Sequence, residues 1–383
     1  MYARLLSTAQ DNIDSLIHDV NALVDAESYS YDKDKLSTCA EVLLKIVRTR
    51  LGEPDEFTRH TDKAYGDTFC LTYEGDNEKN MLFVGHYDTV WPTGTLADWP
   101  DREATDASGR RTLTGPGIFD MKTGVIQAIW ATKLLRDSGE SSPTIHLLFN
   151  GDEEVGSQFS QSIIEESARE MDAALVFEAT LDGKIKVQRK GVGIITATAK
   201  GIEAHAGLNP QDGASAVHAL MEWGSSAVKL ANPTAGTTVN VGTFHGGTGT
   251  NVAAGTATAM VDIRLNSTRE LERLDKELDE IDWSDSRVDI SLTKDWNRPP
   301  MEFTEQSKNL FSVLQNSAQQ LGREIEAASV GGASDANFIS ALNIPVLCGV
   351  GAVGSGAHAR DEYIYPDEIP FFTALAAAVA LNF

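Results

Sequence analysis

The stretch Phe83-Val84-Gly85-His86-Tyr87-Asp88-Thr89-Val90 continues an apolar run that begins at Met81. The run predicts a buried strand over 81–85, with a histidine and an aspartate directly after it. At the two-residue period of extended chain, both side chains can face the same way, so Asp88 could hold the second ring nitrogen of His86. This arrangement is typical of a metal-bound histidine, although a polar turn after a strand is an equal alternative.

Working outward from this stretch, strand and helix patterns alternate through most of the chain. The alternation predicts an α/β fold with a mostly parallel sheet and its ligand site at the carboxyl ends of the strands. The predicted strands cover residues 68–73, 81–85, 144–149, 174–177 and 344–348. The predicted helices cover residues 3–25, 33–50, 121–136, 158–170, 305–322 and 367–382.

Between these parts, residues 191–297 have a different pattern. The predicted order is strand 192–200, helix 212–230, strands 237–244 and 255–265, helix 268–281 and strand 286–293. This β-α-β-β-α-β series is a complete ferredoxin-like unit. The sequence therefore predicts a discontinuous first domain, 1–190 plus 298–383, with residues 191–297 inserted as a second domain.

Two acidic motifs flank predicted elements of the first domain. Asp120 comes just before the helix over 121–136, where an N-cap would be its ordinary role. Glu153 and Glu154 follow Asp152 after an apolar strand, and three adjacent acids repel one another unless a cation lies there. Neighbouring glutamates cannot point the same way, so one of them could bind metal while the other remains a free base.

Two further candidates are Glu178, which closes the strand at 174–177, and His358, which lies in a glycine-rich segment. The combined set has two imidazoles and three carboxylates, from His86, Asp120, Glu154, Glu178 and His358. Two Zn²⁺ with one bridging hydroxide would neutralise these three carboxylates. If Asp120 bridges, each metal also receives one histidine and one glutamate, which leaves an open coordination position for catalysis. Zinc suits these ligands, and cobalt or manganese is also compatible.

The composition and the N-terminal sequence limit which binding partners and which cellular compartment are expected. The formal net charge of −24 disfavours binding to nucleic acid or to anionic membrane surfaces. Three distant cysteines do not form a disulfide framework or a CxxC zinc site. The N-terminal apolar residues have helical spacing with acids between them, unlike a signal peptide, so we expect a cytoplasmic protein.

The complete set of motifs resembles the zinc-dependent metallopeptidase family of carboxypeptidase G, acetylornithine deacetylase, succinyl-diaminopimelate desuccinylase and aminoacylase. The motifs occur in the family's order: GHYDTV at 85–90, GPGIFDMKTG at 115–124, NGDEEVGS at 150–157, FEAT at 177–180, GIEAHAG at 201–207, TGTNV at 248–252, GGASDAN at 331–337 and GSGAHARDE at 354–362. The resemblance covers nearly the whole chain, and the glutamate carboxypeptidase branch is the most similar.

The resemblance implies roles for the candidate metal-site residues. Asp120 would bridge two zinc ions, with His86 and Glu178 on one ion and Glu154 and His358 on the other. Glu153 would be the general base, and Asp88 the acid that orients His86. A cis peptide bond is implied after Asp120.

The resemblance also gives the inserted domain the role of a lid and dimerisation domain. A homodimer would bring His205 from the partner's lid into the active site. Asn251, Arg264 and Arg298 match substrate-contacting positions. An exposed ion pair is an equal alternative for Arg264, and Arg298 could instead anchor the domain junction.

The segment 331–337, which contains Gly332 and Ser334, allows two interpretations. It could cradle a substrate carboxylate with its backbone, or it could form only a turn and a helix cap.

Together these inferences predict a dizinc hydrolase that removes a C-terminal amino acid, most simply glutamate, from a peptide or N-acyl conjugate. Alternatives with the same mechanism are an N-acyl-amino-acid deacylase and a dipeptidase. A catalytically silent metal-binding protein is the remaining alternative, and it is disfavoured because Glu153 and all five candidate ligands are present.

Overall fold

The computed structural model describes residues 1–99 and 101–383, and these residues form two compact units. Unit 1 comprises Met1–Val187, Phe303–Ser329 and Ser334–Phe383, and unit 2 comprises Gln188–Glu302 and Val330–Ala333. Each unit has its own cluster of buried apolar side chains, so each is built around a separate hydrophobic core.

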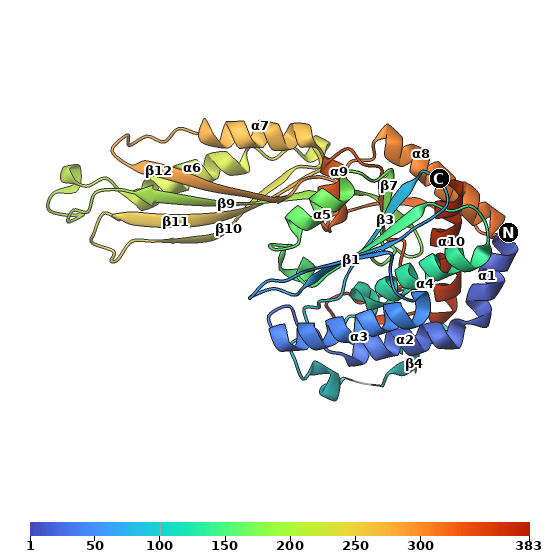
Figure 1. The fold of residues 1–383 in the computed structure, drawn as a ribbon. Helices are drawn as coiled ribbons and strands as arrows, with labels where there is room; N and C mark the ends of the chain where they lie inside the picture. Colours follow the sequence, from blue (N-terminus) through green and yellow to red (C-terminus); the bar gives the residue numbers. More distant parts are fainter. Residues whose placement is uncertain (100) are drawn as a thin grey trace. The chain divides into compact units, whose positions relative to one another are not determined.

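The largest sheet has eight strands (Figure 1). Their spatial order is β1 (Glu56–His60), β2 (Thr68–Tyr73), β6 (Thr144–Asn150), β3 (Asn80–His86), β7 (Ala173–Val176), β14 (Val346–Cys348), β8 (Ile185–Arg189) and β13 (Ala327–Val330). The central strands β6, β3, β7 and β14 pair in parallel, whereas β1 with β2, β2 with β6 and β8 with β14 pair antiparallel. The predicted α/β fold with a largely parallel sheet is therefore confirmed.

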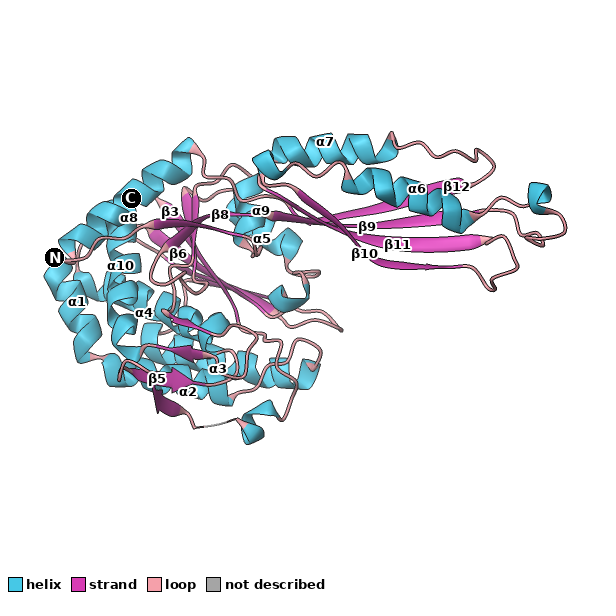
Figure 2. Ribbon diagram, turned by 180° about the vertical axis from the view of Figure 1, so that it is seen from behind, coloured by secondary structure: helices cyan, strands magenta, loops and turns pink. Residues whose placement is uncertain are grey.

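Helices cover both faces of this sheet (Figure 2). One group packs around the contact between α4 (Thr123–Ser138) and α10 (Ile369–Asn382), and it also contains α1 (Tyr2–Asp11), α2 (Ile13–Asp25), α3 (Lys33–Leu51) and α8 (Glu305–Gln320). On the other face, α5 (Gln161–Ala168) contacts α9 (Ala336–Ala341). Coverage on both faces explains why β3 is buried along nearly its whole length, as central parallel strands are.

Unit 1 also contains a second, small sheet that was not predicted from the sequence. Its order is β15 (Gly354–Ser355), β16 (Tyr363–Ile364), β5 (Arg111–Thr114) and β4 (Glu103–Thr105). Strands of two to four residues carry too little periodicity to be recognised. The sheet matters for the site because β15 and β16 flank the segment that contains His358.

The prediction of one helix over residues 3–25 was wrong in one respect. Two helices, α1 and α2, occupy this range and are separated at Asn12, whose side-chain amide donates to the carbonyl oxygen of Thr8 at 2.8 Å. Asparagine competes for backbone hydrogen bonds in this way, and so it favours helix ends. The apolar spacing continues across the break, which hides it from a periodicity argument.

Unit 2 is an antiparallel four-stranded sheet with two helices. The chain order is β9 (Gly191–Lys200), α6 (Ala216–Val228), β10 (Thr238–Gly246), β11 (Thr256–Leu265), α7 (Thr268–Asp279) and β12 (Asp289–Arg298), and the spatial order of the strands is β10-β11-β9-β12. Burial alternates strictly along β9, so only one face of its sheet packs against the core. The predicted β-α-β-β-α-β series is confirmed.

Across the described residues, no helix combines the length and the apolar character needed to cross a membrane. The three cysteines, Cys39, Cys70 and Cys348, are all free thiols.

Candidate metal centre

The carboxyl ends of three parallel strands carry predicted metal ligands. His86 is the last residue of β3, Glu154 lies in the short helix Glu153–Val155 after β6, and Glu178 follows the end of β7 at Val176. Parallel strands end at the same edge of a sheet, so these side chains meet although they are far apart in the sequence.

Asp120 reaches the same edge from the irregular segment Ile118–Lys122, which leads into α4. The peptide bond between Asp120 and Met121 is cis, as the resemblance implied. The start of α4 lies tightly against the end of β7, because a Cβ atom on Gly124 would be only 1.8 Å from the carbonyl oxygen of Phe177. Glycine at this position therefore lets Asp120 approach the strand ends.

The five predicted ligands form two groups that share Asp120. In the first, Nε2 of His86 lies 3.2 Å from Oδ1 of Asp120 and 3.8 Å from Oε1 of Glu178. In the second, Nε2 of His358 lies 3.0 Å from Oε2 of Glu154 and 3.5 Å from Oδ2 of Asp120. Asp120 thus directs one oxygen to each group, which is the arrangement of a bridging carboxylate.

The pKa values of the residues in both groups show that the site favours bound positive charge, whether protons or a cation. Hydrogen bonds with Asp120 and Glu154 raise the pKa of His358 to about 10. Burial opposes the charged form of His86, yet Asp120 and Asp88 still raise its pKa well above the usual value. For Asp120, burial favours protonation, but hydrogen bonds from His358 and His86 outweigh it and lower the pKa. Burial raises the pKa of Glu154 to about 7.

One atom indicates that a cation fits this site. Oε1 of Glu154 is buried and has no hydrogen-bond partner among the described residues. A buried carboxylate oxygen without a donor is costly, and a metal ion is one way to satisfy it. Imidazole nitrogens and carboxylate oxygens are also ligands that zinc, cobalt and manganese accept.

Asp88 lies behind the first group and is completely buried. Nδ1 of His86 is 3.1 Å from its backbone oxygen and 3.4 Å from its carboxylate Oδ1. The carboxylate also accepts hydrogen bonds from the backbone N–H groups of Glu153 (3.1 Å) and Glu154 (3.2 Å), and from the hydroxyl of Ser30 (2.7 Å). Asp88 therefore connects the His86 strand end to the loop of the two glutamates.

Glu153 is half-buried beside this centre, and its negative charge contributes to the raised pKa of His86. Its backbone N–H is fixed by Asp88. Glu153 and Glu154 therefore share a backbone segment that is hydrogen-bonded to Asp88. Of these two glutamates, only Glu154 belongs to a ligand group within the described part of the chain.

Two predicted site residues, His205 and Asn251, are exposed on neighbouring segments of unit 2. The backbone N–H of Ala206 donates to the carbonyl oxygen of Asn251 at 2.8 Å. Nδ1 of His205 accepts from the backbone N–H groups of Gly207 and Leu208, both at 3.1 Å. An Nδ1 that accepts carries no proton, so the neutral imidazole holds its proton on Nε2.

The two arginines expected to contact substrate are both on strands of unit 2. The guanidinium of Arg264 forms a two-pronged ion pair with Asp262 on the same face of β11, with nitrogen–oxygen distances of 3.0 and 2.8 Å. The structure therefore places Arg264 in the ion pair that was its alternative interpretation. Arg298 is buried at the end of β12, opposite Val192 of β9.

The segment 331–337 has the geometry of a turn and cap. Ser334 is fully buried, its hydroxyl accepts from the N–H of Ala336, and its own N–H donates to Oδ1 of Asn337. The carbonyl oxygen of Gly332 accepts from Arg189 at 3.0 Å. These bonds support the cap interpretation of the segment, because they direct the side chain of Ser334 to local backbone groups.

Sequence reasoning missed two residues that support the ligands. Ser30 donates to Asp88, and Glu362 accepts backbone N–H groups from the segment that ends at Asp120. Glu362 could have been noticed because it closes the motif that contains His358. Ser30 lies in the unremarkable sequence Ser28-Tyr29-Ser30, which carries no recognisable signal.

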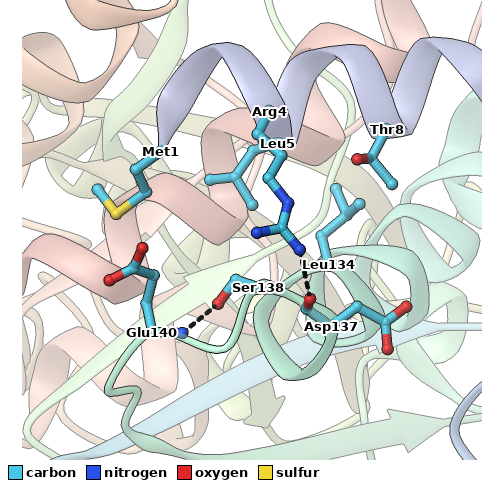
Figure 3. Close-up of a pocket in the computed structure, with 8 residues that line it drawn as sticks. All are labelled: Met1, Arg4, Leu5, Thr8, Leu134, Asp137, Ser138 and Glu140. Carbon is cyan, nitrogen blue, oxygen red and sulfur yellow. Dashed lines mark hydrogen bonds between the residues drawn. The ribbon is translucent and has the colours of Figure 1, made fainter.

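A cavity of about 100 Å³ between α1 and the end of α4 is unrelated to this chemistry (Figure 3). Arg4 points into it and donates to the carbonyl oxygen of Asp137 at 3.3 Å. The described residues that line it include neither a histidine nor a cysteine, and its acids belong to neither ligand group.

The geometry agrees with the comparison of the chain with known families. Residues 82–382 match peptidase family M20/M25/M40. The chain belongs to this family. M20 enzymes are metal-dependent peptidases and amidohydrolases, which agrees with the shared-carboxylate arrangement of the candidate ligands.

Among curated M20 relatives, carboxypeptidase G2 from Pseudomonas sp. (strain RS-16) is 26% identical over 385 residues, covering 99% of this chain and 91% of the relative. Succinyl-diaminopimelate desuccinylase from Dechloromonas aromatica (strain RCB) is also 26% identical, over 357 residues, covering 88% and 91% respectively. Both relatives span nearly the whole chain, but they carry different activities in their names.

Solved structures share the fold. Aminopeptidase PepT from Bacillus cereus ATCC 10987 aligns with a TM-score of 0.80 and 21% identity, covering 97% of this chain and 98% of that chain. An M20 family metallo-carboxypeptidase from Sulfolobus solfataricus aligns with a TM-score of 0.71 and 17% identity, covering 96% and 98%.

Proposed function

We propose that this M20 protein is a dizinc hydrolase that cleaves the amide bond next to a C-terminal amino acid, with glutamate as the preferred residue. The observation that carries the proposal is the sharing of Asp120 between two histidine and carboxylate groups. His86 and Glu178 would hold one ion, Glu154 and His358 the other, and Asp120 both. The similarity to carboxypeptidase G2 over 99% of the chain supports the choice of substrate class.

Zinc bound at these ligands would polarise the scissile carbonyl and lower the pKa of a bound water. Glu153 would accept the proton of the attacking water and deliver it to the leaving amide nitrogen. Asp88 would keep His86 oriented through the contacts with its second ring nitrogen. His205 has the tautomer needed to donate from Nε2 to the oxyanion that forms on the substrate.

The glutamate preference would depend on cationic groups that bind substrate carboxylates. Arg264 is engaged by Asp262, so it would have to exchange that partner for the substrate. Arg298, Asn251 and the backbone around Gly332 remain the other proposed contacts.

A second candidate, an N-acyl-amino-acid deacylase, is favoured by the similarity to succinyl-diaminopimelate desuccinylase. The mechanism would be unchanged, and the acyl group would then determine specificity. A dipeptidase would likewise keep the same centre. We also propose that the protein is a homodimer through unit 2, with His205 acting on the partner's substrate. Its cytoplasmic location stays a prediction.

The experiment that decides the substrate class is a comparison of kcat/KM for N-acyl derivatives of glutamate, aspartate, leucine, alanine and ornithine. We expect glutamate to be cleaved fastest, because only an acidic side chain offers a second carboxylate to the cationic groups of the site, and a hydrogen bond between charged groups contributes about 1.5–3 kcal/mol. A preference for ornithine or leucine would contradict the glutamate proposal and leave the dizinc mechanism standing.

The roles of the two glutamates are tested by isosteric substitutions at adjacent positions. Glu153→Gln should keep both metal ions. Its kcat should fall by about 10²–10⁴-fold, because the substitution removes the proton-transfer group. Glu154→Gln should instead weaken metal binding. Loss of metal in Glu153→Gln, with retention in Glu154→Gln, would reverse the assignment.

A further inference from the structure

Glu362 is a completely buried carboxylate close to the candidate metal centre, and it is not a member of either ligand group. It lies four residues after His358, in a turn closed by the hydrogen bond from its own N–H to the carbonyl oxygen of Ala359 at 3.0 Å. The turn is tight, since a Cβ atom on Gly356 would lie 2.8 Å from the Cα of Glu362. The position of Glu362 is therefore coupled to the segment that contains His358.

Each carboxylate oxygen of Glu362 accepts two hydrogen bonds. Oε1 accepts the backbone N–H groups of Phe119 (2.8 Å) and Asp120 (3.1 Å). Oε2 accepts the backbone N–H of Gly117 (3.1 Å) and the indole N–H of Trp91 (2.9 Å). Four donors therefore converge on one side chain, and three of them belong to the segment that ends at Asp120.

These contacts have a direct consequence for the metal ligands. The segment Ile118–Lys122 contains non-helical backbone at Asp120 and Met121, so no regular helical hydrogen bonding fixes the direction of the Asp120 side chain. Glu362 supplies acceptors to the N–H groups that this irregular backbone leaves unpaired. The same side chain holds the Asp120 segment against the His358 segment.

We propose that Glu362 is a positioning residue, whose carboxylate fixes the backbone of 117–120 so that Asp120 directs one oxygen to each metal ion. It touches neither substrate nor metal. An amide is a poor replacement, because its NH₂ group would face N–H donors where the structure requires an acceptor. The proposal rests on the dinuclear centre proposed above.

The test compares Glu362→Gln with Glu270→Gln. Glu270 is also a buried glutamate, but it lies in unit 2, where it accepts from Thr237 and pairs with Arg273. Zn²⁺ dissociation constants are measured on the full chain by competition with a chromophoric chelator. The visible spectrum of the Co²⁺-loaded protein reports ligand geometry independently of activity.

We expect Glu362→Gln to weaken metal binding by about 10–100-fold and to change the Co²⁺ spectrum, the usual range for losing a partner that orients metal ligands. Glu270→Gln should leave both unchanged, whatever its effect on thermal stability. A wild-type affinity and spectrum in Glu362→Gln, or equal losses in the two variants, would overturn the proposal.

A second variant covers the case in which Glu362→Gln fails to fold. Glu362→Asp keeps the charge but withdraws it by one methylene, so we expect weakened metal binding and an altered Co²⁺ spectrum. Wild-type values for folded Glu362→Asp would then overturn the proposal. Failure of the wild-type chain to bind two ions would instead refute the dinuclear centre, so the two failures can be distinguished.

Discussion

Two buried serines, Ser28 and Ser30, provide a matched test of the hydrogen bonds behind His86. They are 1% and 3% exposed and lie on the same segment. The Ser28 hydroxyl donates to the carbonyl oxygen of Tyr87 at 2.6 Å. The Ser30 hydroxyl has one proton and two acceptors in reach, Oδ2 of Asp88 at 2.7 Å and the carbonyl oxygen of Thr89 at 3.1 Å. The shorter distance and the negative charge favour Asp88 as its acceptor.

The two alanine variants should lose different amounts of stability, because Ser28 donates to a neutral carbonyl oxygen and Ser30 to a carboxylate. A hydrogen bond to a charged group contributes about 1.5–3 kcal/mol to stability, and a neutral one about 0.5–1.5 kcal/mol. We therefore expect Ser30→Ala to lower the free energy of unfolding of the metal-free protein more than Ser28→Ala. Only Ser30→Ala removes a donor from Asp88, so it alone should weaken Zn²⁺ binding, by about 10-fold.

The assay combines urea unfolding of the metal-free variants with competition titration of Zn²⁺. The stability data report the buried hydrogen bond in each variant, and the titration isolates the contribution that passes through Asp88. Unchanged metal affinity in Ser30→Ala, or an equal loss in Ser28→Ala, would refute the inference that Ser30 supports the metal site.

Two further predictions concern unit 2. Mixing inactive His205→Ala chains with inactive Glu153→Ala chains should restore part of the activity on an N-acyl glutamate, because one site of each heterodimer would be intact; no recovery in a verified heterodimer would contradict action across the dimer. Arg273 and Thr237 lower the pKa of Glu270 to about 2, despite the opposing effect of burial. A lowered folded-state pKa gives stability that is present above the unfolded value of 4.5 and is lost as the pH falls to about 2. The stability difference between wild type and Glu270→Gln, measured by urea unfolding, should therefore shrink by about 3 kcal/mol from pH 6 to pH 2; a constant difference would contradict it.

The sequence predicted the parts of the fold that have strong periodicity. The apolar runs of β2, β3 and β6 and the alternating β9 identified strands because burial imposes these patterns on the side chains. Short strands such as β15 and β16 were missed because two residues carry too little periodicity, and β16 also pairs with β5, which is distant in the sequence.

The candidate metal site was predictable because its residues lie at element ends. His86, Glu154 and Glu178 each follow an apolar strand, and the shared sheet edge brings them together. The supporting residues were not predictable in this way. Ser30 reaches Asp88 across 58 positions of sequence, and Glu362 reaches Asp120 across 242. Such contacts are set by tertiary packing, and the one signal in the sequence was that Glu362 closes the motif that contains His358.

Arg264 was predicted from the sequence as a substrate contact, but its side chain has a protein partner in the structure. Its position two residues after Asp262 on one strand face already allowed an ion pair, and the structure forms it. A residue type that matches a substrate-contacting position does not reveal which partner the side chain takes. That choice depends on the groups nearest to it in the folded chain.

The most direct test of the central claim is the metal content of the purified wild-type protein, measured by elemental analysis in parallel with hydrolysis of an N-acyl glutamate. A centre in which Asp120 serves both ligand groups predicts close to two divalent ions per chain. Exhaustive chelation should remove both ions and the activity, and Zn²⁺ or Co²⁺ should restore them. Full activity in a preparation shown to be free of metal would contradict the account.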